Sequence, residues 1–253
     1  MLLAVDIGNT QTTMGVYDGD EMRASWRVSS DRSWASDQIL IQLRSLISLD
    51  GGVEGKIDDA IVCSGVPVLT DAWQGALEYM LGKPAHTVSA ANDYGLPVVY
   101  PNPQEIGPDR IADAVAALEK YGPSTIVVDL GTATNIGVVN DRGEFIGGLI
   151  APGMQISADA LFQRAAKLAQ VELRAPDRVI GKSTVEAMQS GIVYGEVARV
   201  DGLVSMIERE LGYEATVVAT GGLHPLVAPL SSKIQHSDGN LTLDGLRIIS
   251  ERI

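Results

Sequence analysis

The chain contains the same short pattern twice, an apolar run that ends in Asp, an apolar residue and Gly. The first copy reads LLAVDIGNTQT and contains Asp6, and the second reads TIVVDLGTAT and contains Asp129. Small hydroxyl or amide residues follow, so each copy predicts two strands joined by a sharp turn. Each copy is followed by a further glycine-containing turn. When Asp6 is aligned with Asp129, a one-residue gap between the copies brings these later turns into line. The repeat therefore predicts two halves of like topology.

The rest of the chain alternates strand-like and helix-like stretches, which predicts an α/β fold. Apolar residues at helical spacing predict helices at 33–48, 156–169 and 184–211. The proline-containing stretch YGLPVVYPNPQEIGPDR, which precedes a helical segment, is the expected boundary between two domains. We place an N-terminal domain at 1–115 and a C-terminal domain at 116–253, each with a mixed sheet and flanking helices.

The composition indicates a folded, acidic protein. Hydrophobic residues make up 45% of the chain, and 19 Lys and Arg against 32 Asp and Glu give a formal net charge of -13. This charge disfavours binding to a nucleic-acid backbone. The one cysteine, Cys63, cannot form an internal disulfide, and the three scattered histidines do not have zinc-site spacing. With no signal-like segment and no long apolar run, we expect a cytoplasmic protein without a membrane segment.

The repeated turns have the composition of a phosphate site. A strand that ends in Asp and turns through Gly places a carboxylate beside backbone N–H groups, and Gly8 and Gly131 can take positive φ there and let a phosphate approach the backbone. Asp6 and Asp129 could hold hard cations through oxygen. A single turn of this kind is more often structural, with Gly, Asn and Asp serving geometry alone. The repetition favours function, with neutral donors supplied by the following side chains: Asn9, Thr10, Thr12, Thr132 and Thr134.

Two such loops, one in each half, resemble the phosphate loops of the actin, hexokinase and acetate kinase superfamily. The resemblance implies two similar ribonuclease H-like (actin-like) domains around an ATP cleft. A third glycine turn, Thr220-Gly221-Gly222, follows the strand-like TVVA, where this superfamily places its adenosine loop. By itself this third turn is equally explained as an ordinary strand-to-helix connection.

The segment Gly181-Lys182-Ser183-Thr184 has the end of a Walker A loop but not its beginning. The first glycine of that motif would fall at Pro176, where proline removes an N–H and fixes φ. We therefore reject a P-loop and expect a loop that enters a helix, with Thr184 as its cap.

The segment EIGPDR suggests an acceptor site. Asp109 could be a helix cap and Arg110 a solvated surface residue, which is the usual situation. However, a proline-rich loop precedes them, and a carboxylate next to a guanidinium can accept a hydroxyl proton and bind an anionic substrate. The pair therefore has the composition of the acceptor site of a kinase.

The ordered motifs DIGNTQT, YPNPQEIGPDR, DLGTAT, GGLIAPG, GKST with AMQSG, TGGL and LTLDGL resemble the type III pantothenate kinase family over nearly the whole chain. The resemblance implies ATP-dependent phosphorylation of pantothenate, the first step of coenzyme A biosynthesis, by a homodimer that uses Mg²⁺ and a monovalent cation (K⁺ or NH₄⁺). It makes Asp109 the proton acceptor and Asp129 and Asp6 the metal ligands. The implied ATP-binding residues are Asp6, Ile7, Gly8, Asn9, Thr10, Gln11, Thr12, Thr13, Thr132, Gly221 and Gly222. The implied pantothenate-binding residues are Tyr100, Gly107, Pro108, Asp109, Arg110 and Thr184.

The chain departs from this family in two places. Asn135-Ile136-Gly137 follows GTAT, so one optional carboxylate near the cation is missing, and Cys63-Ser64-Gly65 replaces a Ser-Ser-Val type of run. We interpret the second departure as a packing variation. Two alternatives to a pantothenate kinase are a kinase for another small molecule, which the GPDR segment disfavours, and a non-catalytic regulator that keeps the fold.

Overall fold

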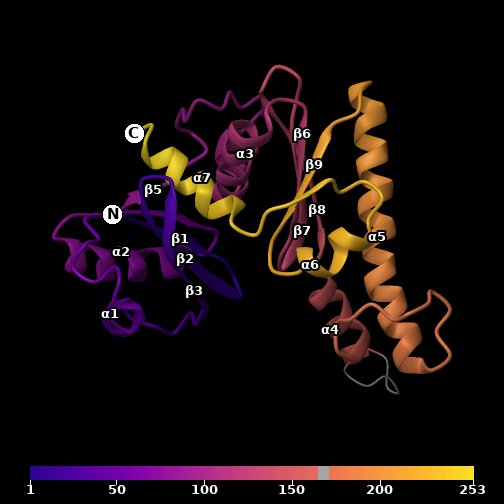
Figure 1. The fold of residues 1–253 in the computed structure, drawn as a ribbon, viewed down its shortest axis with the longest axis horizontal. Helices are drawn as coiled ribbons and strands as arrows, with labels where there is room; N and C mark the ends of the chain where they lie inside the picture. Colours follow the sequence, from indigo (N-terminus) through magenta and orange to yellow (C-terminus); the bar gives the residue numbers. More distant parts are fainter. Residues whose placement is uncertain (165–170) are drawn as a thin grey trace. The chain divides into compact units, whose positions relative to one another are not determined.

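A computed structural model describes residues 1–164 and 171–253, and the chain divides into two compact units. Unit 1 comprises Met1–Ala116 and Leu241–Ile253, and unit 2 comprises Ala117–Asn240. Each unit contains one five-stranded sheet with helices packed against it (Figure 1). We describe the two units one at a time.

The sheet of unit 1 has the strand order β3-β2-β1-β4-β5. Antiparallel pairing joins β1 to β2 and β2 to β3, whereas β4 pairs in parallel with β1 and with β5. The strong turn signal Asp18-Gly19-Asp20 joins β2 to β3, and Gly19 has a φ of 60° there. The strands are β1 (Leu2–Ile7), β2 (Gln11–Asp18), β3 (Glu21–Ser29), β4 (Asp59–Ser64) and β5 (His86–Thr87).

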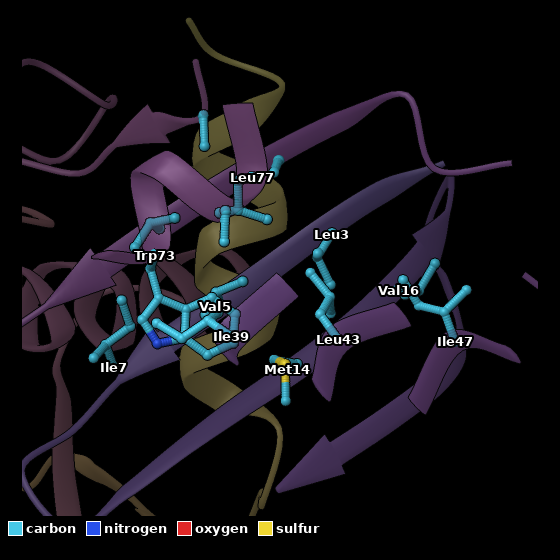
Figure 2. Packing of buried hydrophobic residues seen from close by; sticks show 14 of the residues in the cluster. Leu3, Val5, Ile7, Met14, Val16, Ile39, Leu43, Ile47, Trp73 and Leu77 are labelled. Carbon is cyan, nitrogen blue, oxygen red and sulfur yellow. The ribbon is translucent and has the colours of Figure 1, made fainter. Parts of the chain in front are cut away.

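Helices α1 (Ser36–Asp50) and α2 (Pro67–Leu81) cover one face of this sheet. Alternate residues of β1, such as Leu3 and Val5, point toward Leu43 of α1 and Trp73 of α2 in the buried cluster of Figure 2. The cluster is formed by side chains that alternate along the strands and by side chains that recur about every 3.6 residues along the helices. Both helices end at a glycine in the left-handed conformation.

The other side of unit 1 receives α7 (Leu241–Ser250), the last helix of the chain. The Tyr17 hydroxyl of β2 donates a 2.7 Å hydrogen bond to Asp244, and Thr242 donates one of 2.7 Å to Asp113. Asp113 belongs to α3 (Pro108–Tyr121), which follows the short 3-10 helix η1 (Pro103–Glu105) and contains the division between the two units. Helix α7 therefore belongs to unit 1 although it ends the sequence.

The sheet of unit 2 has the order β10-β9-β6-β7-β8. Antiparallel pairing joins β6 to β7 and β7 to β8, and parallel pairing joins β6 to β9 and β9 to β10. Read from its other edge, this order matches that of unit 1 strand for strand, which confirms the expected repeat. The strands are β6 (Thr125–Leu130), β7 (Ala133–Val139), β8 (Phe145–Pro152), β9 (Thr216–Thr220) and β10 (His236–Ser237).

Helices α4 (Met154–Arg164) and α5 (Thr184–Leu211) pack on one face of the second sheet. Val193 and Val200 of α5 are buried against strand residues such as Val128 and Val217. Two short helices, α6 (His224–Val227) and the 3-10 helix η2 (Ala228–Leu230), follow β9. In the described residues, no helix has the length and hydropathy needed to cross a membrane.

The helix predictions agree with the structure where it can be compared. The helix expected at 184–211 is α5, and the one expected at 33–48 is α1, shifted toward Asp50. The helix expected at 156–169 corresponds to α4 as far as Arg164, and its remaining residues lie outside the described part of the chain. The expected domain range 116–253 differs from unit 2 because the apolar face of α7 packs on the first sheet.

Candidate active site

The first repeated turn lies between β1 and β2. The backbone N–H of Gly8 donates a 3.0 Å hydrogen bond to the carbonyl of Gln11, which closes the turn. Asn9, Thr10 and Gln11 are exposed at its tip, and Asp6 lies half-buried at the end of β1. The turn thus presents backbone and small polar side chains to solvent beside a carboxylate.

Gly8 and Gly131 are able to take positive φ, but neither is among the glycines that adopt it. Their role is close approach instead. A Cβ added to Gly8 would lie 2.8 Å from the Gln11 carbonyl oxygen, and one added to Gly131 would lie 3.3 Å from Oδ1 of Asp129. A side chain at Gly8 would therefore push the turn apart, and one at Gly131 would crowd the Asp129 carboxylate.

Two of the predicted ATP-binding residues in this turn have buried side chains. Ile7 belongs to the core under α1 and α2, and Thr12 shares a 2.9 Å hydrogen bond between its Oγ1 and Oγ of Ser30. Any contact from Ile7 or Thr12 to a ligand must come from the backbone. Thr13 is half-buried and pairs with Asp6 across the two strands.

Asp6 has a neighbour that our sequence interpretation treated as packing only. Cys63 pairs with Asp6 across the parallel strands β1 and β4, and its thiol donates a 3.2 Å hydrogen bond to Oδ1 of Asp6. Burial raises the pKa of the Cys63 thiol well above its usual range, and the charges of Asp6, Asp109 and Asp113 raise it further. The thiol is therefore neutral, and three carboxylates act on it at once.

Asp109 is the second residue of α3, where the sequence left open whether it caps the helix. The backbone N–H groups of Arg110 and Ile111 donate to the carbonyl of Gly107, so Gly107 flanks the first helical residue, Pro108, and Asp109 lies inside the first turn. Oδ1 of Asp109 accepts a 2.9 Å hydrogen bond from the N–H of Arg110, and a Cβ on Gly107 would overlap that same oxygen. The glycine leaves space for the carboxylate.

The other predicted acceptor residues of unit 1 lie in or just before this helix start. Gly107, Pro108 and Arg110 adjoin Asp109 in the sequence and are half-buried. Tyr100 is also half-buried and lies in the segment that precedes η1. The sequence analysis missed Asp113, which is 5% exposed. It lies four residues after Asp109 and so on the same face of α3, a spacing that could have identified it.

The second repeated turn lies between β6 and β7 in unit 2. The N–H of Gly131 donates 3.0 Å to the carbonyl of Ala133, which repeats the closure of the first turn. Asn135 donates from its side-chain nitrogen to Oδ2 of Asp129 over 3.2 Å. Thr132 is exposed at the tip, and a Cβ on Gly153 would overlap its carbonyl oxygen. The turn is therefore packed tightly on its inner side and open at Thr132.

The third glycine turn adjoins the second repeated turn. Gly221 has a φ of 82°, and a Cβ there would overlap Oδ1 of Asp129 and lie 2.7 Å from the nitrogen of Leu130. Gly222 is exposed beside it, and the N–H of Leu223 donates 2.9 Å to the Leu130 carbonyl. Unit 2 thus brings two motifs together that are far apart in the sequence. They are Asp129 with Thr132, and Gly221 with Gly222.

Thr184 is the first residue of α5, and the cap is its neighbour. Oγ of Ser183 accepts a 3.2 Å hydrogen bond from the N–H of Glu186, so our expectation that Thr184 caps this helix was wrong. Thr184 is exposed and lines a groove of about 650 Å³ between α4 and α5. Glu196 and Arg199 also line this groove, and its other residues are mostly apolar.

Glu196 is a second buried carboxylate that the sequence analysis did not identify. It is 4% exposed, accepts a 2.7 Å hydrogen bond from Thr134 Oγ1, and pairs with Arg199. Arg199 also donates over 2.7 Å to the carbonyl of Pro152 at the end of β8. This network ties α5 to the strand that leaves the second repeated turn.

Comparisons with known proteins identify the family that the chain resembles. A model of the type III pantothenate kinase family matches residues 2–206. A type III pantothenate kinase of Frankia alni is 46% identical over 253 residues, covering 100% of this chain and 99% of the relative.

Two solved structures share the fold at low identity. One is a conserved Campylobacter jejuni protein assigned to the Baf family of transcriptional activators, with a TM-score of 0.62, 19% identity and 98% of each chain covered. The other is a ROK hexokinase of Thermus thermophilus, with a TM-score of 0.53, 12% identity, and 98% of this chain and 97% of that chain covered. At these identities the likeness supports the fold alone.

Proposed function

The chain belongs to the type III pantothenate kinase family, and we propose that it transfers the γ-phosphoryl group of ATP to the primary hydroxyl of pantothenate. The products are 4′-phosphopantothenate and ADP, and this reaction is the first step of coenzyme A biosynthesis. The match to curated pantothenate kinases extends over the whole chain, and the sheets have the two-domain architecture of sugar kinases.

One observation carries the proposal most directly. Asp6 of the first turn and Asp109 of the α3 helix start both act on the buried thiol of Cys63. A turn suited to phosphates and a carboxylate suited to an alcohol therefore lie near one side chain within unit 1. A kinase needs this proximity, because the attacking oxygen and the γ-phosphorus must come within bonding distance.

We assign Asp109 the role of proton acceptor. Its carboxylate orients the pantothenate hydroxyl and takes its proton, the oxygen forms the new bond to the γ-phosphorus, and the bond to the β-γ bridging oxygen breaks to release ADP. Arg110 is suited to binding the carboxylate of pantothenate, since a guanidinium matches that group in shape and charge. Tyr100, Gly107, Pro108 and Thr184 complete the proposed pantothenate site.

For ATP we propose the first turn, residues 6–13, together with Thr132, Gly221 and Gly222 of unit 2. Backbone N–H groups in such turns bind phosphate oxygens without adding full charges. Gly222 is exposed beside Gly221 and offers bare backbone to a flat group. A kinase of this family uses ATP.

The carboxylates of Asp6 and Asp129 are suited to bind hard cations that the phosphates of ATP also bind. Within residues 1–164 and 171–253, no group of three or more His, Cys, Asp or Glu could hold a metal ion unaided. Mg²⁺ commonly needs only one or two carboxylates plus substrate phosphates, and Asp6 is our proposed ligand. Bound there, Mg²⁺ would neutralise charge on the phosphates. We propose Asp129 as the ligand for a monovalent cation. We also propose that the active enzyme is a homodimer and that it is cytoplasmic.

A coupled assay for ADP tests the function. Purified protein with ATP, Mg²⁺ and K⁺ should release ADP only when pantothenate is added, and the product should carry phosphate on the primary hydroxyl. Other small alcohols, added one at a time, serve as competing acceptors. Absence of any pantothenate-dependent ADP would favour a non-catalytic regulator, and faster turnover of another alcohol would favour a different kinase.

A further inference from the structure

The segment that follows β3 is fastened to the first repeated turn at three points. The N–H of Ser30 donates 2.9 Å to the carbonyl of Thr10, and Ser30 Oγ shares its 2.9 Å hydrogen bond with Thr12. Arg32 donates from Nη2 to the side-chain oxygen of Asn9 over 2.7 Å. The turn and this segment therefore form one structural piece, although they are far apart in sequence.

Asp31 and Trp34 fix the position of Arg32 in this segment. Oδ1 of Asp31 accepts hydrogen bonds from the N–H and the hydroxyl of Ser33, at 2.9 and 2.6 Å, and the hydroxyl bond is the main reason that the pKa of Asp31 is lowered. Trp34 packs on the core under α1 and α2. The Asp31 carboxylate is thus engaged by Ser33, while the Arg32 side chain reaches Asn9.

Arg32 differs in charge environment from Arg23, another arginine of unit 1. Arg23, on the same sheet, pairs with Asp18 and Glu21, whereas Arg32 forms no ion pair with any of the described residues. A guanidinium carries five N–H donors, and the Asn9 contact uses one nitrogen. In a chain of net charge -13, an exposed arginine beside a phosphate-type turn is a local source of positive charge.

We propose that Arg32 binds the phosphate chain of the nucleotide, with Asn9 holding the guanidinium over the turn. The inference rests on the proposed function, which gives residues 6–13 to ATP. It adds a charged donor to a site whose other phosphate contacts are backbone groups and neutral side chains. The structural alternative is an exposed arginine that only stiffens the turn through Asn9.

Binding of a non-hydrolysable ATP analogue, Mg²⁺·AMPPNP, to the whole protein tests the assignment by calorimetry. We expect Arg32→Gln to weaken binding about tenfold, because a charge-assisted contact is lost. Arg32→Lys keeps the charge and should lose less affinity for Mg²⁺·AMPPNP than Arg32→Gln. Arg23→Gln is the matched control, since it removes an exposed arginine of the same unit at the other end of the β2-β3 pair, and its affinity should equal that of the wild type.

Salt separates the two interpretations. If Arg32 contacts phosphate, the wild-type affinity must fall more steeply with NaCl concentration, at constant KCl, than that of Arg32→Gln. Equal affinities of Arg32→Gln and the wild type, equal salt slopes, or no binding of AMPPNP to the wild type would each overturn the inference. A wild type that binds AMPPNP but does not phosphorylate pantothenate would refute the proposed function, and the comparison of variants would still decide the role of Arg32.

Discussion

The Cys63 thiol donates a hydrogen bond to the Asp6 carboxylate from the neighbouring parallel strand, with a sulfur-to-oxygen distance of 3.2 Å. Because the thiol is buried and its pKa is raised, it acts as a neutral donor at neutral pH. A fixed orientation of Asp6 follows, and Asp6 is the proposed ligand of Mg²⁺.

Replacing Cys63 should therefore change the response of the enzyme to Mg²⁺. Cys63→Ala removes the donor, so we expect turnover to fall about fivefold and half-saturation by Mg²⁺ to move to higher concentration, in line with the loss of one modest hydrogen bond. Cys63→Ser keeps a donor and should stay close to the wild type. Equal Mg²⁺ titrations for the two variants would show that the thiol only fills space.

Asp109→Asn should remove most turnover while leaving ATP binding intact. General-base assistance is typically worth ~10²- to 10⁴-fold, and the amide cannot take the proton. Single-turnover rates and AMPPNP affinity measure the two effects separately. Asp113→Asn is the control from the same face of α3, and because Asp113 accepts from Thr242 of α7, we expect it to affect mainly stability. An Asp109→Asn variant with normal turnover would refute the assignment.

Glu196→Ala should destabilise the protein by about 1 to 3 kcal/mol, because it removes the buried acceptor of the Thr134 hydroxyl and the carboxylate that pairs with the partly exposed Arg199. Glu196→Gln still accepts from Thr134 and should cost less. Urea unfolding followed by circular dichroism gives both values. If the two substitutions cost the same, the hydrogen bond from Thr134 contributes nothing and the network does not support the second turn.

Gly245→Ala should be among the most damaging small substitutions in the chain. A Cβ there would overlap the carbonyl of Ala112 where α7 crosses α3, and overpacking of this kind costs about 3 kcal/mol or more. Gly202→Ala is the matched control, since Gly202 lies in α5 with nothing near its missing Cβ. It should stabilise the protein by about 0.5 to 1 kcal/mol. Thermal unfolding of both variants measures the contrast, and similar midpoints would contradict the close crossing.

Asp201 should make stability depend on acid pH. Its burial raises its pKa, but hydrogen bonds from Ser231, Ser232 and the Ser232 backbone outweigh burial and lower the pKa overall. A lowered native pKa stabilises the fold above the unfolded value of about 3.9, and this stabilisation is lost as the pH falls below it. Between about pH 5 and pH 3, where carboxylates titrate, the free energy of unfolding of Asp201→Asn should therefore fall less than that of the wild type. The exposed Glu210→Gln on the same helix should behave as the wild type.

The repeat, the strand-helix alternation and the long helix α5 could be predicted because their signals lie within short stretches of sequence. Contacts between side chains distant in sequence could not. Arg32 and Asn9 are 23 residues apart, and Thr134 and Glu196 are 62 apart, so no local pattern links them. The turn glycines could be located from the sequence, but the close contact with the Gln11 carbonyl that requires Gly8 could be seen only in the structure.

The assignment of α7 to the first unit has a consequence for synthesis on the ribosome. Unit 2 is one uninterrupted segment and can form its core as soon as it emerges, but the first sheet must wait for Leu243 and its neighbours to cover its second face. During most of translation the nascent N-terminal half therefore exposes apolar strand surface to solvent. Chains that stall before α7 is made should therefore aggregate more readily than complete chains.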